Sequence, residues 1–158
     1  MKILGIDPGL GRTGYALLEQ NDNNITLKEV GCITTRIGEV EYKRLLEIKV
    51  DLDGLITKLK PDAVCVESLF FAANAKTAMS VGQARGVILV TIAGHKLKII
   101  EVTPLQVKIA ATGYGKADKS QVHRMMQTVL KLKKIPKPDD AADAVAIAWA
   151  GISRVKYN

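Results

Sequence analysis

Four carboxylates occupy positions where a folded protein has little structural use for them. Asp7 and Glu67 each end a short apolar run of the kind that forms a buried strand. An ionised carboxylate at the end of a buried strand costs several kcal/mol unless it is paired or bound to metal. The Pro-Gly after Asp7 also allows a turn hydrogen bond to that residue, whereas glutamate is disfavoured in strands and Glu67 has no helix end to cap.

Asp140 and Asp143 lie three residues apart in a predicted final helix, so they share one face of it. The first turn of a helix suits acidic residues electrostatically, which explains Asp139 and offers one explanation of Asp140. It does not explain Asp143, which lies inside an alanine-rich apolar stretch. We therefore expect Asp143 to be solvated or to bind a ligand.

Ligand sites of mixed α/β sheets form near the carboxyl ends of the strands. Asp7 and Glu67 would meet there, and the helix that carries Asp140 and Asp143 can pack across them. Four carboxylates in one place repel one another and raise each other's pKa values, and divalent cations relieve that repulsion. Carboxylate oxygens suit Mg²⁺ or Mn²⁺ rather than zinc. Two such ions about 4 Å apart catalyse phosphoryl transfer by activating water and stabilising the leaving oxygen.

Charge is unevenly distributed along the chain. The 158 residues include 23 Lys and Arg and 16 Asp and Glu, a net charge of +7. Residues 96–137 contain ten of the basic residues and only two acids, so this window carries +8 and the remainder of the chain −1. A basic region beside four acids indicates a polyanionic substrate, and together they predict a nuclease.

Length and composition argue against several other classes. A chain of 158 residues is predicted to form one domain over residues 1–158. No apolar run approaches the ~20 residues that cross a bilayer, and an acid at position 7 comes too early for a signal peptide. Cys32 and Cys65 lie far apart in strand-like runs, which is typical of buried free thiols in a reducing cytoplasm. His95 and His123 lack the spacing of a metal pair and are predicted to be helix-surface or partly buried residues.

The elements that must position these side chains follow from periodicity and from turn residues. Three runs joined by short Gly- and Asn-rich connections predict an antiparallel meander. Two further strands are each preceded by a helix, as parallel connections require. We therefore predict an α/β fold with a five-stranded mixed sheet flanked by helices. The predicted strands are residues 2–7, 13–20, 25–36, 62–67 and 97–102, and the predicted helices are residues 41–60, 74–95, 104–112, 118–131 and 139–154.

Three of the predicted helices begin at recognisable caps. Asn74 is suited to cap the helix over 74–95, and Thr103 precedes a proline at the first helical position of the next. Asp118 and Gln121 have the spacing of a capping box.

These residues lie within motifs that resemble the RuvC family of bacterial Holliday-junction endonucleases, in the RNase H-like superfamily. The motifs occur in the family's order and extend from about residue 3 to residue 149. They are Ile-Leu-Gly-Ile-Asp-Pro-Gly at 3–9, Thr-Gly-Tyr at 13–15, Val-Glu-Ser-Leu-Phe at 66–70, Asn-Ala at 74–75, Val-Gly-Gln-Ala-Arg-Gly at 81–86, Gln-Val-Lys at 106–108, Lys-Ser-Gln-Val at 119–122 and Asp-Ala-Ala-Asp-Ala at 140–144. The predicted order of strands and helices is also that of the RNase H-like fold.

The resemblance implies an endonuclease that cuts two symmetry-related strands of a four-way DNA junction in recombination and repair, leaving 5′-phosphate and 3′-hydroxyl ends. Asp7, Glu67, Asp140 and Asp143 match the family's catalytic acids, which hold two Mg²⁺ ions, with Mn²⁺ as an alternative. It also implies a cytoplasmic homodimer, because the junction has near two-fold symmetry, and the RuvA–RuvB branch-migration complex as a partner. The helix over 74–95 contains glycines that permit close packing on its own sheet or on a second copy.

Lysines of the basic window are the predicted DNA contacts. Lys108 and Lys119 match family positions important for DNA handling and activity, and Lys119 is also predicted to stabilise charge on the scissile phosphate. Lys116 and Arg124 belong to the same window and are predicted to bind DNA.

Phe70 and Phe71 are the only phenylalanines, and they follow the strand that ends at Glu67. Phe70 matches a family aromatic that stacks on a base near the crossover. One of the pair can anchor the loop to the core while the other stacks on a nucleobase, an interaction worth ~1–3 kcal/mol.

Three alternatives stay open at this point. Another RNase H-like nuclease, for RNA–DNA hybrids or as a different resolvase, would keep the acids and change the substrate. Gly-Ile-Asp-Pro-Gly at 5–9 also resembles the phosphate-binding hairpin of actin-like ATPases, which need two such domains and a much longer chain. A non-catalytic DNA-binding module would have no use for four acids beside a polyanion unless metal is bound.

Overall fold

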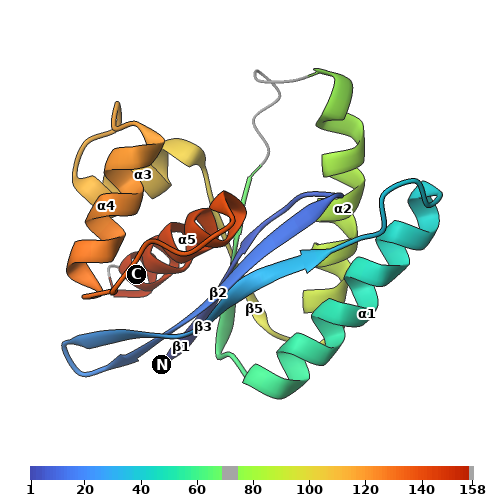
Figure 1. Ribbon diagram of the computed structural model, residues 1–158. Helices are drawn as coiled ribbons and strands as arrows, with labels where there is room; N and C mark the ends of the chain where they lie inside the picture. Colours follow the sequence, from blue (N-terminus) through green and yellow to red (C-terminus); the bar gives the residue numbers. More distant parts are fainter. Residues whose placement is uncertain (69–74, 157–158) are drawn as a thin grey trace.

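The computed structural model describes residues 1–68 and 75–156, and its elements follow the predicted order (Figure 1). Each predicted strand and helix is present, with ends that differ by at most a few residues; the proposed cap Asn74 lies outside the described residues. The elements are β1 (Lys2–Asp7), β2 (Arg12–Asn21), β3 (Asn24–Thr34), α1 (Glu41–Leu59), β4 (Ala63–Glu67), α2 (Ala75–Gly94), β5 (Lys98–Val102), α3 (Pro104–Thr112), α4 (Lys119–Val129) and α5 (Asp139–Lys156).

The five strands form one mixed sheet in the order β3-β2-β1-β4-β5. β2 pairs antiparallel with β1 and β3, whereas β4 runs parallel to β1 and β5. Short turns suffice for the antiparallel pairs, and the parallel pairs require the crossovers that α1 and α2 supply. The predicted topology is therefore confirmed.

Helices cover both faces of this sheet (Figure 1). α1 and α2 lie on one face, and α5 lies on the other with α3 and α4 beside it. Alternation along β1 divides its side chains between the two layers: Leu4 and Ile6 belong to the core under α1 and α2, and Ile3 to the core under α5.

α5 approaches the sheet closely at two glycines. A Cβ on Gly5 would lie 2.3 Å from the carbonyl oxygen of Ala144, and one on Gly14 would lie 2.0 Å from that of Asp140. Both distances are far shorter than van der Waals contact, so only glycine allows the backbone of α5 to rest against β1 and β2 at these points. The first turn of α5 is thereby held next to the carboxyl end of β1.

Capping boxes fix the beginnings of α3 and α4. The Asp118 side chain accepts a hydrogen bond from the backbone N–H of Gln121 at 2.8 Å, and the Gln121 side chain accepts from the backbone N–H of Asp118 at 2.9 Å. The predicted box is confirmed, and Thr103 and Gln106 form a second one. Because α4 begins immediately after Asp118, the box also fixes the position of Lys119.

The two cysteines are free thiols with different surroundings. Cys65 on β4 is buried as predicted, whereas Cys32 is only half-buried because β3 is an edge strand of the sheet. Within the described ranges, no helix combines the length and the apolar character needed to cross a membrane.

Candidate active site

The parallel pairing of β1 and β4 brings two of the predicted acids together. Ile6 pairs with Val66, so Asp7 and Glu67 come next at the same edge of the sheet. Ile6 and Val66 both belong to the core under α1 and α2. Since side chains alternate along a strand, Asp7 and Glu67 point to the opposite face, toward α5.

α5 supplies the other two acids, and all four carboxylates share one electrostatic environment. Burial raises the pKa of Asp7 to about 8, and the charges of Asp143, Glu67 and Asp140 contribute to the rise in that order. Burial and the charge of Asp143 raise the pKa of Glu67 to about 7. These shifts mean that the cluster favours the binding of protons or other cations.

Basic side chains bind the two acids of α5. Arg12 Nε lies 3.0 Å from Oδ2 of Asp140. The carboxylate of Asp143 has two partners: Lys119 Nζ lies 2.6 Å from Oδ2, and His123 Nε2 lies 2.7 Å from Oδ1. The charge of Lys119 also lowers the pKa of Asp7 and of Glu67, so its ammonium group acts on three of the four acids.

The oxygen donors of the four carboxylates fit hard divalent cations, although the side chains do not form a preorganised metal site. Within residues 1–68 and 75–156, no group of three or more His, Cys, Asp or Glu side chains lies close enough together to hold a metal ion. Arg12 and Lys119 take carboxylate oxygens that a metal would need. Four crowded carboxylates with hard oxygen donors nevertheless match Mg²⁺ or Mn²⁺, and a bound cation would compete with these two basic side chains.

A cavity of about 230 Å³ opens beside the acids. Its polar lining includes Glu67 and Asp143 together with Lys108 and Lys119. The two lysines singled out in the sequence therefore lie at the carboxylate cluster, on α3 and α4 respectively.

The other predicted DNA contacts are not brought to this cavity. Lys116 is exposed in the connection between α3 and α4. Arg124 is on the exposed side of α4, where it lines a separate cavity of about 410 Å³ with Tyr114. Phe70 and Phe71 lie outside the described residues.

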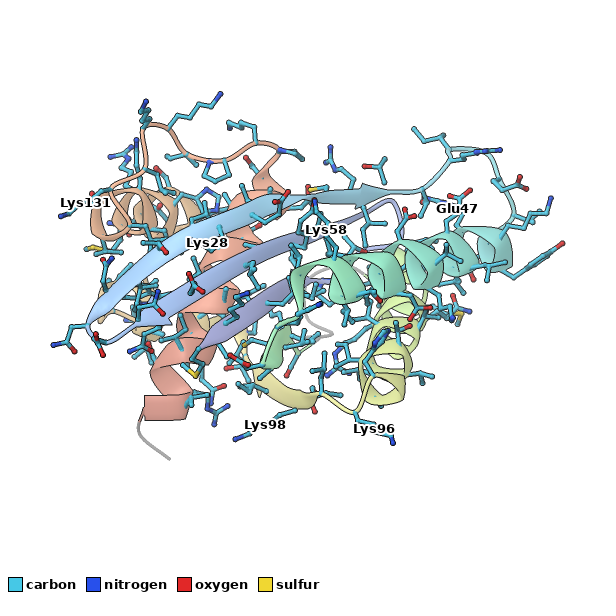
Figure 2. All side chains as sticks on the ribbon, turned by 90° about the horizontal axis from the view of Figure 1, so that it is seen from below. Lys28, Glu47, Lys58, Lys96, Lys98 and Lys131 are labelled. Carbon is cyan, nitrogen blue, oxygen red and sulfur yellow. The ribbon has the colours of Figure 1, made fainter. Side chains whose placement is uncertain are left out.

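The basic window of residues 96–137 does not form one surface. Figure 2 shows Lys96 and Lys98 at one edge of the molecule and Lys131 at a distant end, beside α4. Lys98 begins β5 opposite the first residue of β4, whereas Glu67 pairs with Val102 at the other end of both strands. The prediction of a single basic region is therefore wrong, because neighbours in sequence are separated by the length of β5 and of α4.

Three basic residues of the site were not predicted. Arg12 and His123 bind acids of α5 directly, as described above. Arg85 of α2 donates from Nε to the backbone carbonyl of Glu67 at 3.3 Å and forms an ion pair with Glu101, which ties the end of β4 to β5. A signal existed for His123, because it follows Lys119 by four residues and therefore shares its face of the helix.

Comparisons with known proteins agree with this geometry. The family model for crossover junction endodeoxyribonuclease RuvC matches residues 3–150. The crossover junction endodeoxyribonuclease RuvC of Halothermothrix orenii is 52% identical over 148 residues, covering 94% of this chain and 90% of that protein. The protein of the same description from Alkaliphilus oremlandii is 49% identical over 148 residues, with the same shares.

A solved structure extends the agreement to three dimensions. The structure described as T. thermophilus RuvC in complex with Holliday junction substrate matches with a TM-score of 0.93 at 30% identity, covering 99% of this chain and 96% of that one. The five-stranded sheet and its helices are thus the RNase H-like fold, as predicted. On the family match and these relatives, the chain belongs to the RuvC family of crossover junction endodeoxyribonucleases.

Proposed function

We propose that this protein resolves Holliday junctions by paired, symmetric hydrolysis of two strands, leaving 5′-phosphate and 3′-hydroxyl ends during recombination and repair. The observation that carries the proposal is the cluster of Asp7, Glu67, Asp140 and Asp143 at one edge of the sheet, beside a cavity that also contains Lys108 and Lys119. Acids that crowd one another beside a cavity that also presents two lysines suit the cleavage of a phosphodiester.

Each group has a distinct role in the proposed mechanism. The four carboxylates would hold two Mg²⁺ ions, with Mn²⁺ as an alternative, and such ions supply an activated water and stabilise the leaving oxygen. Asp7 would be central to holding the ions, because its pKa responds to the charge of each of the other three acids. Lys119, once its bond to Asp143 is broken, can stabilise charge on the scissile phosphate, and Lys108 can hold the neighbouring backbone.

Asp7→Asn tests the assignment of the acids, because asparagine has nearly the same side-chain shape as aspartate but carries no carboxylate charge. We expect the variant to bind a synthetic mobile four-way junction with near wild-type affinity and to produce no paired nicks in Mg²⁺. Asp51→Asn, at an exposed position on α1, is the matched control and should cleave normally. Wild-type cleavage by Asp7→Asn would refute the assignment.

A substrate comparison separates this function from that of other RNase H-like nucleases. The protein should cut a four-way junction in preference to a linear duplex or an RNA–DNA hybrid of the same sequence. Preferred cleavage of the hybrid would instead indicate a ribonuclease.

We assign the homodimer contact to an apolar groove between α1 and α2, on the face of the sheet opposite the acids. The groove has a volume of about 910 Å³, and its lining includes Tyr42, Leu46 and Val90, with 71%, 59% and 74% of their surfaces exposed. Gly86 also lines it, and a Cβ there would meet no atom within 4 Å, so this glycine is not needed for packing within the chain. A second copy is the natural occupant, because a nearly two-fold junction needs two nicks.

Val90→Glu tests this contact by placing a charge in the groove. Sedimentation should show that this variant is a monomer, and a cleavage assay should show that it no longer makes paired nicks. Val50→Glu, at an exposed position of α1 outside the groove lining, is the control and should remain dimeric. A dimeric Val90→Glu protein would place the contact elsewhere. Partnership with the RuvA–RuvB complex and a bacterial cytoplasmic location are supported by family membership alone.

A further inference from the structure

His123 is a buried polar residue whose ring contacts a proposed catalytic acid. Its side chain is only 8% exposed, and Nε2 lies 2.7 Å from Oδ1 of Asp143. Its helix neighbours Val122 and Met126 are buried in the core that α4 and α5 share. Because these contacts hold the ring in place, the imidazole cannot swing into solvent as an exposed lysine can.

The two oxygens of Asp143 have different surroundings. Oδ1 is directed to the buried face of α4, where His123 holds it. Oδ2 is 2.6 Å from the amino group of Lys119, whose charge also acts on Asp7 and Glu67. Lys119, Asp143 and Glu67 line the same cavity, so Oδ2 is the oxygen bound on the cavity side, by a side chain that is 53% exposed.

We propose that His123 is a positioning residue that fixes the Asp143 carboxylate so that Oδ2 faces Asp7 and Glu67. The hydrogen bond between His123 and Oδ1 remains when a divalent cation binds. The bond between Lys119 and Oδ2 is then exchanged for one between Oδ2 and the cation. His123 itself touches neither DNA nor the cation. This inference rests on the proposed metal site and deepens it by explaining how one ligand is held ready.

Restraint of a ligand by a hydrogen-bond partner has a measurable size in metalloproteins. Loss of such a partner typically reduces metal affinity or activity by about 10- to 100-fold. Asp143 has a reason to need this restraint, because Lys119 and the other acids exert opposing forces on the same carboxylate.

Two variants of similar size separate the hydrogen bond from packing. His123→Gln keeps an N–H donor at similar reach, and His123→Leu fills the space without one. We expect His123→Leu to bind Mn²⁺ about tenfold more weakly than wild type, in titrations of the DNA-free protein followed by electron paramagnetic resonance. His123→Gln should remain within about threefold of wild type. Junction affinity should be unchanged in both, and raising Mg²⁺ should restore cleavage by His123→Leu.

Met126→Ala is the control for a purely structural effect, because Met126 is also buried on the same helix. It should lower the melting temperature and leave Mn²⁺ affinity unchanged. An equal loss of Mn²⁺ affinity in Met126→Ala would overturn the positioning role. If His123→Leu does not fold, His123→Ala replaces it with the same expected loss.

Asp7→Asn in the same titration distinguishes failure of the inference from failure of the metal site. If Asp7→Asn binds Mn²⁺ as well as wild type does, the proposed metal site is wrong. If Asp7→Asn loses Mn²⁺ while His123→Leu retains wild-type affinity, the metal site stands and the role of His123 is overturned.

Discussion

The acidic residues of the candidate active site repel one another. Asp7 lies among three other acids, and burial adds to their effect on its pKa. Lys119 relieves part of this repulsion by binding Asp143 at 2.6 Å. The crowded acids therefore cost stability in the structure as it stands, which is common where function needs like charges close together.

The stability of the metal-free protein should fall as pH rises. In the unfolded chain Asp7 and Glu67 lose their protons near their ordinary pKa values of 3.8 and 4.5, whereas the folded protein retains them until about 8 and about 7. Between these limits the folded state binds more protons, so deprotonation favours unfolding, by on the order of a few kcal/mol at pH 8.5. In EDTA we expect a higher melting temperature at pH 5 than at pH 8.5.

Asp7→Asn should remove much of that difference and should melt above wild type at pH 8.5. Added Mg²⁺ should stabilise wild type more than the variant at this pH. A wild-type melting temperature that rises steadily from pH 5 to pH 8.5 in EDTA would contradict the raised pKa values.

The four acids and Lys119 were singled out from the sequence, whereas Arg12 and His123 were not. Asp143 stands out because an alanine-rich helix gives it no structural role. Arg12 and His123 have ordinary structural explanations when read along the chain. Their contacts depend on how the start of β2 and the helix α4 pack against α5, which local patterns do not encode.

Among the elements, α5 matters most to the site because it carries two acids and rests directly on the sheet. Periodicity and turn residues were enough to predict all ten elements. The close approach of α5 was not predicted, since Gly5 and Gly14 in a strand have several explanations and only the packed structure selects one.

Gly14→Ala should damage both stability and cleavage. Its Cβ would lie 2.0 Å from the carbonyl oxygen of Asp140, so the start of α5 must move. Overpacking of this kind should lower the free energy of unfolding by about 1–3 kcal/mol. Chemical denaturation measures this loss. Gly54→Ala is the matched control: a Cβ there meets nothing within 4 Å, so a stability no lower than wild type is expected from the better helix former. Normal stability and cleavage in Gly14→Ala would show that α5 is not constrained at this point.

At the scale of the whole molecule, position relative to the acids decides which basic residues matter. Lys108 lines the active-site cavity, whereas Lys98 lies at the opposite end of β5 from the residue paired with Glu67. Counting charge along the chain overstated how much positive charge lies beside the acids, because a folded chain separates its sequence neighbours.

Junction affinity should decrease steeply with salt, and the two lysines should contribute differently. Lys108→Ala should reduce the slope of log affinity against log salt by about one, which is the loss expected for one phosphate contact. Lys98→Ala, with the same loss of charge, should leave the slope unchanged. Filter binding or fluorescence anisotropy over a salt series measures both. Equal slopes for the two variants would mean that the cavity does not contact the DNA backbone.

The contact of α5 with the sheet through Gly5 also bears on how such a protein can change over generations. Main-chain atoms of Ala144 and Ala148 meet β1 at Gly5, so at this point α5 rests on the sheet with no side chain between them. Core residues such as Ile147 can then be exchanged for others of similar volume with little effect on the distance between α5 and β1 at Gly5. The side chains of the core can therefore change while the helix that carries Asp140 and Asp143 keeps its distance from the sheet.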